Sequence, residues 1–204
     1  MFTALSSRAK STVSTSKVAE RKYHHGDLRA ALLAEGLRLI EEADADALSL
    51  REVARAAGVS ATAVYRHFPD KRALMVALAQ EGVRRLGEAQ DAAATGNGAT
   101  AFSAIGRAYV RFALANPGLF RLTFTYPGLE IGDPGNDRAA SLLHDHALEL
   151  AHGDERLARI VALRAWALVH GLALLILDGR VPRDDALIDA TIAAAALAQD
   201  AACP

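Results

Sequence analysis

The amino-acid sequence predicts an all-α fold made of two helical parts. Of its residues 51% are hydrophobic but only 5% are aromatic, and alanine and leucine supply most of the apolar share, which favours helices over strands. Apolar residues recur at helical spacing along most of the chain, whereas no strand-like alternation extends beyond a few residues. A chain of 204 residues can also bury a core without disulfides or structural metals.

Two helices are predicted after residue 25. Apolar residues recur at helical spacing over 28–43, and an acidic stretch then ends this first helix. Ser49 stands three residues before Glu52, which is the spacing of a capping box, where each side chain accepts a hydrogen bond from the other residue's backbone N–H. A second helix of two turns therefore begins there, and Gly58 ends it because glycine readily adopts a left-handed backbone.

A third, very short helix follows a sharp turn. Ser60 can cap it, and Pro69 cannot continue it, so the helix runs only to Phe68. Such a short helix is unstable alone in water and must be held by packing, for which Val64 and Phe68 supply an inward face at i, i+4. Asp70 then caps a longer fourth helix.

The chain divides into three parts. Residues 1–24 are rich in Ser, Lys and Arg and are expected to form a flexible basic arm. Residues 25–92 contain the first four helices, and Gly96-Asn97-Gly98 marks the boundary to a second helical domain at 99–204. The helices expected in that domain run from about 101 to 115, from 116 onward, from 138 to 152, from 154 to 177, and beyond Pro182.

Charge is distributed unevenly, although the net charge is only −1. Residues 1–90 carry 14 Lys and Arg against 11 Asp and Glu, and residues 91–204 carry 9 against 13. The first part is thus mildly suited to a polyanion such as DNA. Basic tails are equally common on proteins that never meet nucleic acid, so charge alone leaves this open.

Several function classes are disfavoured. Cys203 is the only cysteine, which excludes an intramolecular disulfide and a thiolate metal cluster. The three histidines within 144–152 lack the i, i+4 spacing of a metal site, and no nucleophile–base pattern or phosphate loop is evident. The N-terminal segment lacks an export signal, and the apolar stretch 165–177 is shorter than a membrane span. We expect a soluble, cytoplasmic protein that is not an enzyme and needs no cofactor or metal.

The second and third helices have the features of a helix-turn-helix. They are short, a turn containing Gly58 joins them, and small residues stand where they must cross. The start of the third helix is small and polar and could enter a major groove about 12 Å wide. Hydrogen-bond donors suited to phosphate follow it at Tyr65, His67 and Lys71. Ordinary capping or packing remains the alternative for Tyr65 and His67, as solvated charge does for Arg51 and Arg66.

The segment 49–74 strongly resembles the DNA-binding domain of tetracycline-repressor-type (TetR family) regulators. The match lies in the string SLREVARAAGVSATAVYRHFPDKRAL, with its Ser cap, Ala-Gly-Val-Ser, Tyr-x-His-Phe and following Lys, and it extends over about 25–75. The resemblance implies that Ser60, Ala61 and Thr62 lie near base edges. It also implies that Tyr65, His67 and Lys71 hold phosphates. The full set of candidate DNA-binding residues is Ser49, Arg51, Ser60, Ala61, Thr62, Tyr65, His67 and Lys71.

A weaker resemblance covers the second half. The segment 116–124, NPGLFRLTF, and the pattern Trp166-x-x-x-His170-Gly171 are similar to the C-terminal domain of a TetR subgroup named for its Trp-His-Gly signature. This resemblance implies a pocket for a small, largely apolar effector. The candidate pocket residues are Phe102, Ile105, Tyr109, Phe112, Phe120, Phe124, Trp166 and His170. Plain core packing remains the alternative for each aromatic, and a buried, hydrogen-bonded histidine for His170.

Dimerisation is expected because one helix-turn-helix reads few base pairs, so such proteins normally pair about a two-fold axis on a palindromic site. The segment 192–198 is apolar at every position, and the helix at 154–177 is similarly apolar. We expect these two helices to form a four-helix interface with their copies. Most regulators of this family are repressors, so the resemblance implies a repressor that an effector releases from its operator. A constitutive DNA-binding protein without a cavity, or a small enzyme or carrier, remains the rival hypothesis.

Overall fold

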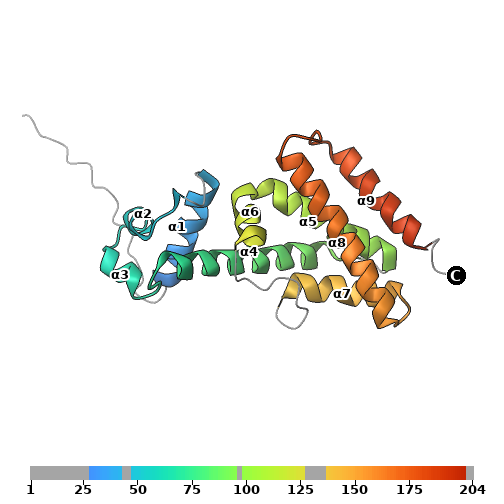
Figure 1. The fold of residues 1–204 in the computed structure, drawn as a ribbon, viewed down its shortest axis with the longest axis horizontal. Coiled ribbons are helices and arrows are strands. Elements are labelled where there is room, and N and C mark those ends of the chain that lie inside the picture. The colour runs from blue at the N-terminus through green and yellow to red at the C-terminus, as the bar shows by residue number, and fades with distance from the viewer. Residues whose placement is uncertain (1–27, 43–46, 96–97, 127–136, 201–204) are drawn as a thin grey trace, which may run out of the picture.

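The computed structural model describes residues 28–42, 47–95, 98–126 and 137–200, of which 195–200 are described by backbone alone. All the regular structure within these ranges is helical, which confirms the predicted all-α class (Figure 1). The predicted arm at 1–24 lies outside the described residues. The helices are α1 (Leu28–Glu42), α2 (Leu50–Ala56), α3 (Ala61–Tyr65), α4 (Lys71–Ala93), α5 (Gly98–Ala115), α6 (Pro117–Thr125), α7 (Arg138–Leu150), α8 (Glu155–Leu177) and α9 (Asp185–Asp200).

The local signals around α2 and α3 act as the sequence predicts. The backbone N–H of Ser49 donates to Glu52 Oε2 at 2.9 Å, and the N–H of Glu52 donates to Ser49 Oγ at 3.2 Å, which completes the capping box. Gly58 has φ +68° and ends α2, since residues with a side chain rarely adopt that conformation. Helix α3 is shorter than expected, because the chain leaves the α-helix after Tyr65 and reaches Phe68 through a turn.

Helix α4 is the long axis of the molecule (Figure 1). Its first turns lie beside α1, and further along it packs against α5, α6 and α7. One hydrophobic cluster consequently runs without a break from Leu32 in α1 to Ile192 in α9. The glycine-rich segment after α4 separates the helices of the two halves along the chain. Helix α4 nevertheless packs against helices of both halves.

The remaining helices surround the far end of α4. Helix α5 packs against α4, α7, α8 and α9, and α8 also lies against α7 and α9. A second, smaller apolar cluster forms between α5, α7 and α8 around Phe102, Ala147 and Ala158. By length and composition α8 is apolar enough to cross a membrane, and only 28% of its most apolar window is buried inside the subunit. Much of its apolar surface therefore faces outward.

Candidate nucleic-acid interface and ligand cavity

Helix α3 is held against the protein by a small apolar face. Val64 and Phe68 are almost completely buried, and the guanidinium of Arg29 in α1 lies 5.4 Å from the centre of the Phe68 ring. Ser60 Oγ accepts a hydrogen bond from the N–H of Ala63 at 3.2 Å and so caps the helix. Packing thus replaces the stability that five helical residues lack on their own.

The other face of α3 points to solvent. Thr62, Tyr65 and His67 are exposed, and Tyr65 is 48% exposed, which is unusual for a large aromatic residue. Lys71, the first residue of α4, is exposed beyond it. Figure 1 shows α3 at the end of the molecule opposite to α7, α8 and α9, so these helices leave this face uncovered.

Ser49 and Arg51, the two candidate DNA-binding residues at the start of α2, differ in their surroundings. The Ser49 hydroxyl accepts from the Glu52 backbone and donates to Glu52 Oε2 at 2.8 Å, so the capping box uses both of its hydrogen-bonding roles. Arg51 is exposed on α2. The other six candidate DNA-binding residues lie on α3 or directly beside it: Ser60, Ala61, Thr62, Tyr65, His67 and Lys71.

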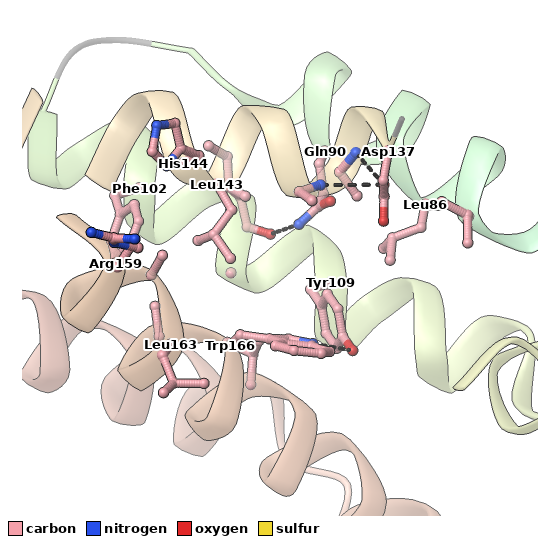
Figure 2. A pocket seen from close by; sticks show the side chains of 18 of the residues that line it. Leu86, Gln90, Phe102, Tyr109, Asp137, Leu143, His144, Arg159, Leu163 and Trp166 are labelled. Carbon is pink, nitrogen blue, oxygen red and sulfur yellow. Dashed lines mark hydrogen bonds between the residues drawn. The ribbon is translucent and has the colours of Figure 1, made fainter. Parts of the chain in front are cut away.

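A cavity of about 690 Å³ lies at the other end of α4, between α4, α5, α7 and α8 (Figure 2). Five of the eight predicted pocket residues line it: Phe102, Ile105, Tyr109, Phe124 and Trp166. The volume is in the range of pockets that enclose drug-sized ligands, and most of the lining side chains are apolar. The cavity is the concave site in the described chain that best fits a small organic molecule.

The other three predicted residues do not line this cavity. Phe120 is fully buried and packs edge-to-face on Tyr109, with 5.6 Å between ring centres. Phe112 lies on another side of α5, beside a shallower hollow between α4 and α5. His170 stands behind the cavity wall, where its Nδ1 lies 2.8 Å from Tyr109 Oη. Phe120 and His170 therefore support the lining residue Tyr109, whereas Phe112 belongs to another side of α5.

Two walls of the cavity come from helices that the sequence did not single out for it. Helix α4 contributes Val83, Leu86 and Gln90, and α7 with its N-cap contributes Asp137, Ala139, Ala140, Leu143 and His144. Helix α8 adds Glu155, Arg159 and Leu163 beside Trp166. The spacing of Val83, Leu86 and Gln90 already places them on one face of a helix, and a glutamine on an otherwise apolar face was the available signal.

A chain of hydrogen bonds holds the two aromatic lining residues Tyr109 and Trp166 in place. The indole N–H of Trp166 donates to Tyr109 Oη at 3.2 Å, and the Tyr109 hydroxyl can donate its own hydrogen to His170 Nδ1. Burial raises the pKa of the Tyr109 hydroxyl and lowers the pKa of His170. Both shifts favour the neutral forms, which is the protonation state that this chain of donors requires.

Helix α6 links the cavity to the N-terminal helices. Glu41, at the end of α1, accepts hydrogen bonds from the N–H groups of Gly118 and Leu119 at 3.1 and 2.9 Å. A Cβ on Gly118 would lie 2.5 Å from the backbone oxygen of Ile40, so only glycine allows this close approach of α6 to α1. At the other end of α6, Phe124 lines the cavity. One short helix therefore touches both regions.

Comparisons with known proteins agree with this architecture. Residues 32–78 match the family model described as bacterial regulatory proteins, tetR family, and residues 102–197 match the model described as tetracyclin repressor-like, C-terminal domain. The chain belongs to the TetR family. It is therefore a DNA-binding transcription regulator with a ligand-binding C-terminal domain. The Trp-His-Gly subgroup is not named by either match and stays a prediction.

Solved structures show the same TetR fold. The chain is 33% identical to a protein of unknown function from Rhodococcus sp. RHA1, with a TM-score of 0.70 over 89% of this chain and 98% of that one. It is 21% identical to a TetR family transcription regulator from Marinobacter aquaeolei VT8, with a TM-score of 0.64 over 83% and 94% of the two chains. A TetR variant from Acinetobacter baumannii AYE in complex with minocycline is 21% identical, with a TM-score of 0.58 over 85% and 92%. No curated protein matches the sequence.

Proposed function

We propose that this TetR-family protein is a homodimeric, cytoplasmic repressor that leaves a palindromic operator when a small, largely apolar effector occupies the cavity. The observation that carries the proposal is helix α4, which begins at exposed Lys71 beside α3 and forms the cavity wall with Leu86 and Gln90. A ligand that moves this helix changes the position of the DNA-binding surface.

The proposed DNA contacts are those of the exposed α3 face. Ser60, Ala61 and Thr62 have short side chains, which allow the helix to sit deep in a major groove and meet base edges. Tyr65 and His67 flank this end as phosphate donors, as does Lys71. Arg51 reaches a neighbouring phosphate, whereas Ser49 acts indirectly by capping α2.

The proposed dimer forms through the outer faces of α8 and α9. Ile160, Leu163 and Leu175 of α8 are 47%, 62% and 47% exposed, a large apolar surface for a soluble subunit. A Cβ on Gly171 in the same helix would meet nothing within 4 Å, so a partner helix can approach closely there. Ile192, which the sequence assigned to the interface, is buried in its own subunit, and side chains from 195 onward lie outside the described residues.

The proposed release works through α4 and α6 together. A Cβ on Gly82 in α4 would lie 2.1 Å from Thr123 Oγ1 in α6, so the side chains of α6 pack directly on the backbone of α4. A ligand that displaces Phe124 would therefore push α6 against α4 and, through Glu41, against α1. A near-complete switch requires the ligand to prefer one state by about 10⁴-fold.

The test is a selection of bound sequences from a random DNA pool with the full-length protein. We expect an inverted repeat to be enriched, with half-sites about one helical turn apart, because a two-fold dimer presents two α3 helices. Enrichment of a single half-site or of no sequence would contradict the proposal. The cavity favours this function over a constitutive DNA-binding protein, which has no use for an open space of this size.

A further inference from the structure

A buried glutamine stands in the wall of the cavity. Gln90 is 4% exposed and lies on α4 one turn after Leu86, so its amide is removed from bulk water. Its Nε2 donates to the backbone oxygen of Ile105 at 3.5 Å, a long hydrogen bond. Because a carbonyl oxygen only accepts, this contact places Nε2 towards Ile105 and leaves Oε1 towards another neighbour.

No described residue donates to that oxygen. Gln90 Oε1 is fully buried and has no hydrogen-bond partner within the described part of the chain. Buried acceptors are almost always satisfied in folded proteins, so an unpaired oxygen on a residue that lines the cavity marks a place for an absent donor, which the oxygen meets when the amide turns towards the open space.

The residues around Gln90 indicate what kind of molecule could supply the missing donor. Asp137 is also buried in the cavity wall, and its Oδ1 accepts from the N–H groups of Ala139 and Ala140 at 2.9 and 3.2 Å. This end of the cavity therefore carries two buried side chains with acceptor oxygens. Figure 2 draws Gln90 and Asp137 at one end of the cavity, away from Phe102, with Trp166 on the facing wall.

We infer that the ligand of this cavity is an apolar, ring-containing molecule with an N–H or O–H group that donates a hydrogen bond to Gln90 Oε1. The aromatic and aliphatic walls bind its body, and the Gln90 acceptor orients it. This inference rests on the proposed ligand-binding function and adds the chemical class of the ligand.

The test uses a matched pair of fluorescent probes on the full-length protein. N-phenyl-1-naphthylamine has an apolar body and one N–H, and its N-methyl derivative has the same rings without a donor. We expect the native protein to bind the N–H probe about fivefold more tightly, which is the effect of one net hydrogen bond. In Gln90→Met, a substitution of similar volume, the two probes should bind equally.

Two controls keep the result interpretable. Gln80 is exposed on the same helix, so Gln80→Met should keep the native preference. Gln90→Leu provides a second apolar variant if Gln90→Met does not fold, as judged by thermal melting. A preference that persists in either Gln90 variant comes from the bulk of the methyl group and contradicts the inference.

The outcomes separate this inference from the proposed function. Equal binding of both probes by the native protein would leave the ligand-binding cavity in place and overturn only the donor assignment, with water as the partner of Oε1. If neither probe binds up to its solubility, the cavity is closed to apolar molecules in solution. That result would overturn the proposed effector class together with this inference.

Discussion

The α3 end and the cavity end of this TetR-family protein are built in different ways. The α3 end consists of short helices whose limits are set by neighbours in the sequence, such as the capping box at Ser49 and the left-handed Gly58. The cavity combines side chains from α4, α5, α6, α7 and α8, which meet only after folding. Substitutions at the α3 end should therefore act locally, whereas those near the cavity should act through neighbouring helices.

The largest expected effect is the loss of the core under α3. Phe68→Ala removes an almost fully buried ring, and we expect the free energy of unfolding to fall by about 3–5 kcal/mol in urea denaturation. Tyr65→Ala is the matched control, because that ring is exposed and should change stability by no more than roughly 0.5 kcal/mol. Equal losses of unfolding free energy in both variants would contradict the packing of α3 on the buried Phe68 ring.

The second prediction concerns the charge beside α3. Lys71→Ala should weaken DNA binding uniformly across sequences and reduce the slope of log affinity against log salt by about one, since one phosphate contact is lost. Arg180→Ala, an exposed cation after α8, should leave the slope unchanged. Fluorescence anisotropy at several salt concentrations measures both, and an unaltered slope in Lys71→Ala would remove this residue from the contact set.

The third prediction tests the connection between the two ends. Glu41→Ala removes the acceptor of two backbone N–H groups at the start of α6, and we expect a loss of about 1 kcal/mol in the free energy of unfolding. The reduction of operator affinity by N-phenyl-1-naphthylamine should also diminish. Glu42→Ala, which breaks only an exposed pair with Arg38, should retain the native response. Identical behaviour of the two variants would exclude this route.

The smallest expected effect is a pH dependence at the cavity wall. Burial lowers the pKa of His170, so the unfolded chain binds its proton more readily, and stability falls as the pH drops below the ordinary histidine pKa near 6.5. His170→Asn keeps an acceptor for Tyr109 but does not titrate. Unfolding free energies at pH 7.5 and 5.5 should differ less in this variant than in the native protein, and an equal difference would contradict the assignment.

By itself, the sequence determined the helical class, the limits of α2 and the face of α3 that meets solvent. Caps, glycine turns and apolar spacing act within a few residues, so the outward position of Tyr65 follows from the inward positions of Val64 and Phe68. Only the tertiary structure decided that Phe124 meets the cavity while Phe120 supports it, and that Gln90 and Asp137 share its wall. Helical periodicity states which residues share a face, but the angle and spacing of the neighbouring helices decide whether that face is covered or left open.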